Sequence, residues 1–519
     1  MMSQTIKAVR GTRDLLPPET SLWNRIEATA RQVFTRYNFG EIRTPIFEDT
    51  SLFARGVGEE TDIVSKEMYT WEDRARAQSE KPQSLTLRPE NTAGVVRAYI
   101  EHKLGESGQL QKLYYIGPQF RRERPQKGRY RQFWQIGAEV IGPPSAGSES
   151  PLRDAEILEM LATLLDELGS TGWTLELNSV GSAADRAKYN EVLRAALEPV
   201  AARMCQDCQR RAVTNPLRVL DCKVPEDQPI IETLPKIADC LDEDSKKHFA
   251  QVTAALDAAG VRYHLNSRLV RGLDYYTRTT FEFTHGGLGA QNALLGGGRY
   301  DGLSEAIGGP KAPGIGFAIG LDRLVLTLQA QENNQSSTTP PGKIDAYIAP
   351  LGENLNASAL KLAQELRRAG LNVELGEGGF RLKKSFEAAE KHADRIVILG
   401  EDELAQDVFT VKDFSTGEQF KIPGAGFLGG RKASASQQGI QERIDGLTKW
   451  LKLLAVFLNC TVDYKPAAGL YGYRWQVIAG DSPDYIGLEG GEIGLPDEGR
   501  RQILAGKLLR LVQMRDLRR

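Results

Sequence analysis

The 519-residue sequence has no run of about 18 consecutive apolar residues, so a membrane-spanning helix is not expected. Its amino terminus lacks the apolar core of a secretory signal. Cysteine is scarce, with 5 residues, and this odd number argues against a disulfide framework. We therefore expect a cytoplasmic protein without a membrane association.

The sequence also lacks an excess of charge of either sign. Its 66 Lys and Arg residues nearly balance 68 Asp and Glu residues, and the net charge is -2. Nonspecific binding of a polyanion over the whole surface is therefore excluded, and such a contact would need a local basic patch. The hydrophobic fraction of 41% and the charged fraction of 26% exclude a mostly disordered or fibrous chain.

The length predicts three or four domains of about 100 to 200 residues each. The polar run NNQSSTTPPGK at 333–343 ends in proline and glycine and predicts a linker. Before this run, expected helices and strands alternate irregularly, which is typical of an α+β domain. The clearest are helices at 22–37 and 153–168 and strands at 112–116 and 133–141.

After the linker, short hydrophobic strands alternate with helices at 355–369 and 383–393. This order predicts repeated βα units of a parallel sheet in a small α/β domain. A second flexible run at 424–439 separates a final segment, in which we expect an apolar helix at 440–458 and a basic helix at 497–519.

The most informative segment is YIGPQFRRERPQKGRYRQFWQIGAEVIG at 115–142, in which two expected strands flank a loop. Residues 121–131 contain six basic residues and one acidic residue. Such a concentration of positive charge attracts phosphate, whereas the alternative is a solvated basic hairpin.

Two further segments combine charged or aromatic residues with an expected turn. SLTLRPENTAGVVRAYIEH at 84–102 predicts a strand, a turn and a helix, and Glu90 beside the helix start could be only a favourable amino-terminal charge. RLVRGLDYYTRTTFEF at 268–283 places Arg271 next to two tyrosines before an expected strand.

Glycine is concentrated in two other segments. LGGGRYDGL at 295–303 removes three successive Cβ atoms, as is needed where the backbone approaches a ligand or another part of the chain. PGIGFAIGLDRLVL at 313–326 predicts a strand that turns into a helix with Arg323 in its first turn. This arrangement suits an anion, or only the packing of a helix on a strand.

In this order, these segments closely resemble the bacterial type of histidyl-tRNA synthetase, a class II aminoacyl-tRNA synthetase. The resemblance covers about residues 7–423 and includes AVRGTRDLLPPE and TPIFEDTSLFARGVGEETDIVSKEMYTW near the amino terminus. RGLDYY and GGGRYDGL are similar to the two histidine-specific signatures of the family. The segments around Pro45, Arg121 and Arg323 are similar to the three general class II motifs.

The resemblance implies an α+β fold with an antiparallel-sheet catalytic core, an insertion, a small α/β anticodon-binding domain and an additional carboxy-terminal segment. The expected divisions are a core at 1–332 with an insertion at about 185–262, a linker at 333–343, an anticodon-binding domain at 344–423, a flexible linker at 424–439 and an extension of unknown role at 440–519.

The implied function is the ATP-dependent attachment of L-histidine to tRNA(His) through a histidyl-adenylate, by a homodimer whose interface includes Pro45. ATP would bind as its Mg²⁺ complex, without a tightly bound cofactor. An alternative is a catalytically inactive paralogue that acts as a histidine-binding regulatory subunit. Such relatives typically lack the domain after the linker and parts of the basic loop, all of which are present here.

The resemblance also implies roles for individual residues. Arg121 would bridge the α-phosphate of ATP and the histidine carboxylate, and Arg271 would stabilise charge on the α-phosphate, so both are candidate catalytic residues. The expected ATP-binding residues are Arg121, Glu123, Arg129, Phe133 and Arg323, and the expected tRNA-binding residues are Arg124 and Gln126.

The residues implied for histidine binding are Glu90, Asn91, Thr92, Arg121, Gln135, Glu139, Arg271, Tyr275 and Tyr276. A neutral imidazole has one N–H donor and one acceptor, so the Glu139 carboxylate opposite the Tyr276 hydroxyl would recognise both nitrogens. Buried hydrogen bonds of this kind reject side chains that cannot pair.

Four of the five cysteines lie close together in the sequence: Cys205, Cys208, Cys222 and Cys240. The spacing of the first pair is compatible with a structural zinc site of four thiolates. The segment also resembles the insertion of the family, which implies no general requirement for zinc. We therefore do not favour zinc at these cysteines and expect no metal ligands among the site residues.

The basic helix expected at 497–519 has three interpretations that the sequence leaves open. It could pack on the synthetase body with a solvated charged face, contact tRNA, or bind another protein.

Overall fold

The computed structural model describes residues 5–59, 61–73, 82–126, 128–288, 292–334, 343–406, 408–423, 448, 451–452, 461–464, 472–478, 483–489 and 503–508. The chain divides into two compact units, Met1–Thr338 and Thr339–Arg519, here called the amino-terminal and carboxy-terminal units. Among the described residues, no helix combines the length and apolar character needed to cross a bilayer.

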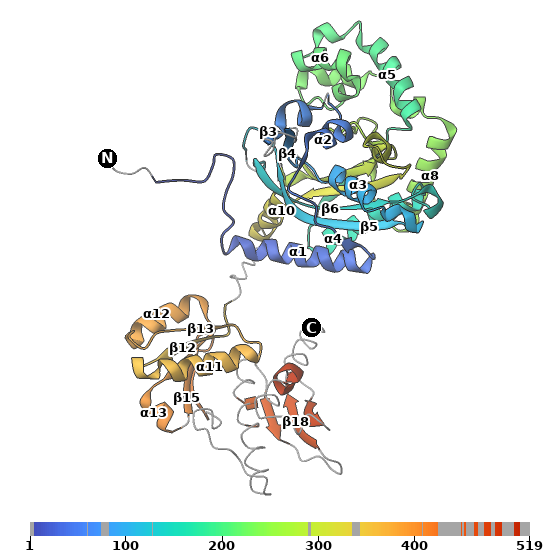
Figure 1. Cartoon of the computed structure of the whole chain (residues 1–519). Coiled ribbons are helices and arrows are strands. Elements are labelled where there is room, and N and C mark those ends of the chain that lie inside the picture. Colours follow the sequence, from blue (N-terminus) through green and yellow to red (C-terminus); the bar gives the residue numbers. More distant parts are fainter. Residues whose placement is uncertain are drawn as a thin grey trace. The chain divides into compact units, whose positions relative to one another are not determined.

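The amino-terminal unit is built on an eight-stranded sheet (Figure 1). The interior pairs are antiparallel, and only the pairs at the two edges are parallel, which confirms the expected antiparallel core. In spatial order the strands are β1 (Gly40–Glu41), β5 (Gln111–Phe120), β6 (Gln132–Ile141), β11 (Gly314–Gly320), β10 (Ala293–Arg299), β9 (Thr277–His285), β7 (Trp173–Ser179) and β8 (His264–Leu265).

One face of this sheet is covered by four helices that share its main hydrophobic core. They are α1 (Glu19–Arg36), α4 (Pro151–Glu167), α8 (Glu243–Ala258) and α10 (Leu321–Asn334). The helices predicted at 22–37 and 153–168 are confirmed as α1 and α4. On β6, Ile136, Ala138 and Val140 belong to this core, so the alternation of a strand directs the residues between them to the opposite face.

A second, smaller core lies against the opposite face of the sheet. It includes residues of α2 (Thr50–Val57) and α3 (Thr92–Glu101). The Asp49 side chain accepts a hydrogen bond from the Ser51 amide at 2.8 Å and thereby caps α2. A small antiparallel sheet precedes α3, with β2 (Phe47–Asp49), β4 (Gln83–Leu87) and β3 (Tyr69–Asp73) in that order.

Between β7 and β8 the chain is helical. The elements before α8 are α5 (Ala183–Leu197), η4 (Ala201–Arg203), α6 (Gln206–Thr214), η5 (Pro216–Val219), η6 (Pro225–Asp227), α7 (Gln228–Glu232) and η7 (Ile237–Cys240). Buried residues of this stretch of the chain, from Val180 to Leu241, form a separate hydrophobic cluster. In Figure 1, α5 and α6 lie at the opposite end of the unit from α1.

The carboxy-terminal unit contains a five-stranded sheet. Its strands, in spatial order, are β13 (Val373–Leu375), β12 (Ala346–Pro350), β14 (Arg395–Leu399), β15 (Val408–Asp413) and β16 (Gln419–Pro423). The predicted helices at 355–369 and 383–393 are confirmed as α11 (Asn356–Arg368) and α12 (Leu382–His392), and α13 (Glu401–Ala405) follows β14.

The predicted parallel sheet is only partly correct. β12 is parallel to β13 and β14, as expected for βα units, but β15 pairs antiparallel with β14 and with β16. β15 and β16 are joined by the five residues 414–418, which is too short for the crossover that a parallel pair requires.

The final segment contains a three-stranded antiparallel sheet that the sequence analysis did not predict. Its strands are β17 (Thr461–Tyr464), β18 (Gly472–Ile478) and β19 (Pro483–Glu489). Trp475 of β18 is fully buried and donates its indole N–H to Thr448 Oγ1 at 2.7 Å. Trp475, Val462 and Leu504 belong to the same hydrophobic cluster as Ile348 and Leu362 of the α/β domain.

Of the two helices predicted in the final segment, short parts are described. Positions 448, 451–452 and 503–508 are helical. The remainder of the helices predicted at 440–458 and 497–519, and the predicted flexible run at 424–439, lie outside the described residues.

Candidate active site

A cavity of about 870 Å³ lies in the amino-terminal unit. Its lining includes residues of β6, β9, β10 and β11, the start of α3, the loop after β5 and part of the helical insertion. Most of the predicted site residues line it: Glu90, Asn91, Thr92, Arg121, Glu123, Arg129, Phe133, Gln135, Arg271, Tyr275, Tyr276 and Arg323. Residues as far apart in the sequence as Glu90 and Arg323 are thus brought together.

Three arginines reach this cavity from three separate segments: Arg121 after β5, Arg271 before β9 and Arg323 in the first turn of α10. Arg121 Nε donates to the Pro89 carbonyl at 2.9 Å, and its guanidinium lies 5.2 Å from the centre of the Phe133 ring. These contacts fix the guanidinium in place. Several planar cations in one cavity suit an anionic ligand such as a polyphosphate.

The other two arginines are also held by neighbouring groups. Arg323 Nη1 donates to the Ala293 carbonyl at 2.9 Å, and Arg271 forms an ion pair with Glu282. Burial lowers the pKa of Arg323, and the nearby charge of Arg129 lowers it further. Negative charge from a ligand would offset the cost of burying the Arg323 charge and would reduce the repulsion between the two cations.

The loop at 121–131 divides its side chains between the cavity and the surface. Glu123 and Arg129 line the cavity and form an ion pair at 3.2 Å. Arg124 and Gln126 are exposed and do not line the cavity, and the backbone of Gln126 pairs with that of Arg129 in a tight turn. The predicted nucleotide-binding and tRNA-binding residues of the loop therefore lie in different surroundings.

Glu139 is fully buried on β6, behind the residues that line the cavity. Its Oε1 accepts a hydrogen bond from Thr92 Oγ1 at 2.7 Å. Burial raises the pKa of Glu139 to about 8, against the effect of the Thr92 hydroxyl, and the charge of Glu90 adds to the rise. The cavity thus has a carboxyl group beneath its wall that changes ionisation near neutral pH.

Glu90 lies at the amino-terminal end of α3 and also lines the cavity. Its two carboxylate oxygens accept from the amides of Thr92 at 2.7 Å and Ala93 at 3.0 Å. Burial raises the pKa of Glu90, and these amides oppose the rise. The side chain therefore has the amino-terminal helix contacts that the sequence suggested, and it adds negative charge to the cavity.

The Asn91 side chain accepts hydrogen bonds from other segments of the protein. Its Oδ1 accepts from Thr44 Oγ1 at 2.6 Å and from Arg88 Nη1 at 3.4 Å. Arg88 also donates to the carbonyl of Pro118 at 3.0 Å. Asn91 therefore links the start of α3 to β5 through the buried Arg88 guanidinium.

The glycines of the GGGRYDGL segment allow side chains to approach β10 closely. A Cβ atom on Gly296 would lie 2.4 Å from Arg271 Nη1, which is too close for any real contact. The same requirement holds on β11, where a Cβ on Gly316 would lie 1.7 Å from Glu139 Oε2. Both glycines are thus needed to accommodate predicted site residues.

Two aromatic residues of the RGLDYY segment form a cluster with Tyr300, which directly follows β10. The rings of Tyr275 and Tyr276 are 4.8 Å apart, and the Tyr300 ring is 6.0 Å from that of Tyr275. All three line the cavity. Burial raises the pKa of Tyr276, so its hydroxyl stays protonated and can donate or accept a hydrogen bond.

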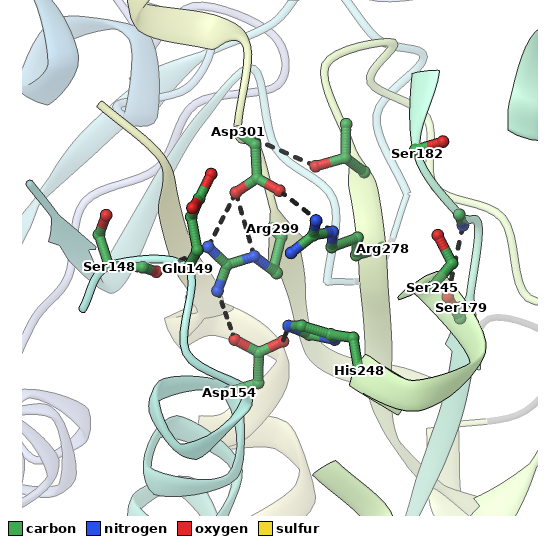
Figure 2. A network of polar contacts seen from close by, with 12 residues as sticks. Ser148, Glu149, Asp154, Ser179, Ser182, Ser245, His248, Arg278, Arg299 and Asp301 are labelled. Carbon is green, nitrogen blue, oxygen red and sulfur yellow. Dashed lines mark hydrogen bonds and ion pairs between the residues drawn. The ribbon is translucent and has the colours of Figure 1, made fainter. Parts of the chain in front are cut away.

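Arg299, next to Tyr300, takes part in a buried ion-pair network (Figure 2). It donates to Asp154 Oδ1 at 2.6 Å, to the Ser148 carbonyl at 2.7 Å and to Asp301 Oδ1 at 2.8 Å. Burial alone would lower the pKa of Arg299, but the two aspartates raise it above its ordinary value. The network ties the end of β10 to α4 and so supports the segment that contains Tyr300.

The sequence analysis missed several residues that line the cavity: Glu67, Tyr115, Arg218, Glu282 and Tyr300. Tyr300 and Glu282 lie within segments that were singled out, and Glu282 follows Arg271 closely enough to be considered as its partner. Tyr115 also lies within a segment that was singled out, at the start of 115–142, but the argument there rested on the basic loop. Arg218 has no local sequence signal, because it comes from the insertion.

The structure also changes the expected cysteine cluster. The Sγ atoms of Cys205, Cys208 and Cys222 and a carboxylate oxygen of Asp227 all lie within 4.8 Å of one another. Cys240 is not part of this group and lies at the end of η7, beyond α7. The set of four cysteines that the sequence analysis considered, without favouring zinc, is therefore not the set that the structure brings together, since Asp227 stands in place of Cys240.

Comparison with known proteins gives the same family over most of the chain. A model of the family described as histidyl-tRNA synthetase matches residues 11–324, and a model described as anticodon binding domain matches residues 345–429. The final segment after residue 429 lies outside both matches.

Two relatives and one solved structure are closely similar to this chain. The histidine–tRNA ligase of Koribacter versatilis (strain Ellin345) is 73% identical over 418 residues, which are 80% of this chain and 94% of the relative. That of Solibacter usitatus (strain Ellin6076) is 56% identical over 419 residues, 80% and 96% of the two chains.

The crystal structure of apo S. aureus histidyl-tRNA synthetase has a TM-score of 0.66 with this chain. The two sequences are 39% identical, and the match covers 82% of this chain and 99% of the other. With a family match over more than half of its residues and a relative at 73% identity, this chain belongs to the histidyl-tRNA synthetase family.

Proposed function

We propose that this protein is a histidine–tRNA ligase that activates L-histidine with ATP and transfers it to tRNA(His). The observation that most supports the proposal is the convergence of Arg121, Arg271 and Arg323 on one cavity, next to the buried pair of Glu139 and Thr92. The arginines suit a nucleotide polyphosphate, and the buried polar pair suits a small polar side chain such as imidazole.

ATP is the nucleotide in this proposal, and it enters as its Mg²⁺ complex. Arg121 contacts the α-phosphate, and Glu123 and Arg129 hold the nucleotide. Phe133 stacks on the adenine, since an aromatic face suits a base. Arg323 lies on the other side of the base and contacts the γ-phosphate. All five residues line the cavity.

Histidine occupies the part of the cavity nearest to Glu139. Glu90 and Gln135 take its ammonium group, and the Glu139 carboxylate and the Tyr276 hydroxyl pair with the two imidazole nitrogens. Asn91, Thr92 and Tyr275 complete this pocket, with Asn91 acting through its contacts to Thr44 and Arg88. The proposal is supported by the buried position of Glu139, where an unpaired polar partner is costly.

The reaction needs no proton transfer in its first step. A histidine carboxylate oxygen forms a bond to the α-phosphorus of ATP, and the bond from that phosphorus to the β-phosphate bridging oxygen breaks, which releases pyrophosphate. Charge develops on the α-phosphate oxygens, where Arg271 and Arg121 stabilise it. The terminal ribose hydroxyl of tRNA then attacks the carbonyl of the adenylate, and AMP leaves.

The parts of the chain outside the cavity have proposed roles in binding tRNA and in assembly. Arg124 and Gln126 contact the tRNA acceptor end, consistent with their exposure on the loop. The domain at 344–423 binds the anticodon, and the active form is a homodimer with Pro45 at its interface. Because tRNA charging supplies translation, we place the protein in the cytoplasm.

An ATP–pyrophosphate exchange assay with each of the twenty amino acids tests this proposal. Exchange with histidine alone supports it, whereas exchange with another amino acid, or none, contradicts it. Arg271→Ala should lower the exchange rate by about 10²-fold or more while changing the histidine affinity little, because its role is to stabilise the transition state. A rate within about threefold of the wild type would contradict the role of Arg271.

A matched variant separates the two halves of the basic loop. Arg124→Ala should retain histidine-dependent exchange, because this side chain lies outside the cavity, and should raise the KM for tRNA in aminoacylation. Loss of exchange in Arg124→Ala would show that the loop is not divided as proposed.

A further inference from the structure

The helical insertion brings four potential metal ligands to one place, although they come from three different turns. Cys205 immediately precedes α6 and Cys208 lies in its first turn, whereas Cys222 follows η5 and Asp227 ends η6. The ligand atoms all lie within 4.8 Å of one another. The four residues do not come from one helix or strand, so their convergence depends on how the short elements of the insertion pack together.

The distances between these atoms fit a tetrahedral site. With zinc–sulfur bonds of about 2.3 Å, two thiolates on a tetrahedral ion lie about 3.8 Å apart. Cys205 Sγ and Cys222 Sγ are 3.9 Å apart, and Cys222 Sγ is 3.2 Å from Asp227 Oδ2. A disulfide would need about 2.05 Å between the sulfurs, and all four described cysteines are free.

Three of the four ligands are buried, Cys205 is half-buried, and hydrogen bonds already order their surroundings. Cys208 is 0% exposed, Cys222 5% and Asp227 1%. The amide of Cys205 donates to Asp227 Oδ1 at 3.0 Å, and the amide of Val224 donates to Cys222 Sγ at 3.4 Å. Hydrogen bonds of this kind orient metal ligands and stabilise the charge on thiolate and carboxylate groups.

We propose that Cys205, Cys208, Cys222 and Asp227 bind one Zn²⁺ ion in a closed, structural site. Three sulfur ligands favour zinc over magnesium or calcium, which prefer oxygen, and four protein ligands leave no position for a substrate. The sequence analysis did not favour zinc, and this ligand set differs from the four cysteines considered there, because the fourth ligand is Asp227 and not Cys240.

The site would fix one wall of the cavity. Asp221 and Lys223, on either side of Cys222, line the cavity, as does Arg218 of η5. Arg218 also lies 3.5 Å from Asp62, which follows α2. The metal ion would hold the turn after η5 in position and so maintain the contact between the insertion and the catalytic core.

Metal analysis of the full-length protein tests this proposal independently of the proposed function. The protein is purified under reducing conditions, without chelators, from medium that contains zinc, and its bound metals are measured by mass spectrometry. About one Zn²⁺ per chain is expected. Cys222→Ser and Asp227→Asn should lower the zinc content at least tenfold, whereas Cys240→Ser, a variant of a buried cysteine outside the site, should keep it.

A second measurement avoids dependence on how well the variants fold. Wild-type protein is stripped of metal and titrated with Co²⁺, whose visible absorption distinguishes tetrahedral thiolate coordination from the octahedral ion in water. Tetrahedral bands that saturate at one equivalent and disappear when Zn²⁺ is added support the site. Wild-type protein that contains no zinc and gives no tetrahedral cobalt spectrum would overturn the proposal, as would equal loss of zinc in Cys240→Ser and Cys222→Ser.

Discussion

At the scale of single residues, Glu139 combines full burial with a position next to the proposed histidine pocket. Its pKa is raised to about 8 mainly by burial, so in the empty site much of it is protonated at neutral pH. An ionised carboxylate is a stronger acceptor for an imidazole N–H than a neutral carboxyl group. If histidine binds to the ionised form, a proton must leave, and histidine affinity must rise as the pH approaches and passes 8.

The pH dependence of the KM for histidine therefore tests the role of Glu139. The KM should fall between about pH 7 and pH 8.5, above the range in which free imidazole titrates, whereas the KM for ATP should change little. In Glu139→Gln the KM for histidine should be higher and this fall should disappear, because an amide does not ionise. Equal changes in the KM values for histidine and ATP would contradict the assignment.

Gly316 offers a second test of the proposed histidine pocket, because it lies on β11 and pairs with Glu139 of the neighbouring strand β6. The added methyl group of Gly316→Ala would lie 1.7 Å from Glu139 Oε2 and 2.8 Å from the Ala138 carbonyl, so Glu139 must move. We expect at least a tenfold rise in the KM for histidine, equivalent to about 1.4 kcal/mol of binding free energy.

The control for Gly316→Ala is Gly302→Ala. No atom lies within 4 Å of a Cβ built at Gly302, and its φ of -100° is open to alanine, so both KM values should stay near the wild type. A Gly316→Ala variant that folds and keeps its histidine KM would mean that Glu139 does not contribute to the pocket.

At the scale of elements, Arg299 is the buried link between β10 and α4. Replacing it with leucine would leave Asp154 buried without its cation, and breaking a buried pair in this way costs about 3 to 5 kcal/mol. Arg299→Leu should therefore lower the free energy of unfolding of the amino-terminal unit by that amount, measured by urea unfolding as a lower midpoint at an unchanged m value.

Lys246→Met is the surface control, because it breaks an exposed pair with Glu243 at 2.8 Å. Its effect on the free energy of unfolding should be much smaller than that of Arg299→Leu, because an exposed ion pair in water contributes little. Similar losses in Arg299→Leu and Lys246→Met would show that the buried network contributes no more than a surface pair.

The elements also show how far the sequence could predict this fold. α1, α4, α11 and α12 were predicted within a few residues, because the periodicity of a helix is a local property of the sequence. The antiparallel pairing of β15 was not predicted, since strand order depends on contacts between distant segments. The sheet of β17, β18 and β19 was missed because its short strands lie in a glycine-rich part of the sequence.

The same limit applies to the site. The family motifs predicted the cavity-lining positions of Arg121, Arg271 and Arg323, because each lies in a recognisable segment. Arg218 and Asp227 were missed, since only the folded insertion brings the first to the cavity and the second to the cysteines. A single residue without a local pattern can be assigned to a site only when the tertiary structure is known.

At the scale of the whole molecule, the proposed chemistry and the final segment belong to different units. Every predicted site residue lies in Met1–Thr338, whereas the final segment belongs to Thr339–Arg519. Deleting residues 439–519 should therefore leave histidine-dependent pyrophosphate exchange unchanged. Thermal stability of the carboxy-terminal unit should fall, because Val462, Trp475 and Leu504 are part of its hydrophobic cluster.

The same deletion distinguishes the open interpretations of the final segment. If it contacts tRNA, aminoacylation should weaken and its dependence on salt should become shallower, because fewer counterions are released on binding. If it only packs on its neighbour, the salt dependence should not change. A folded truncated protein without pyrophosphate exchange would contradict the separation of the two units.

The most direct test of the whole proposal is the charging of tRNA(His) with radiolabelled histidine by the full-length protein. Binding of histidine alone would also be expected of a regulatory paralogue, so only transfer to tRNA identifies a ligase. We predict ATP-dependent transfer of histidine to tRNA(His) that is nearly abolished in Arg271→Ala. A folded protein that binds histidine and ATP but attaches no histidine to tRNA(His) would contradict the proposed function.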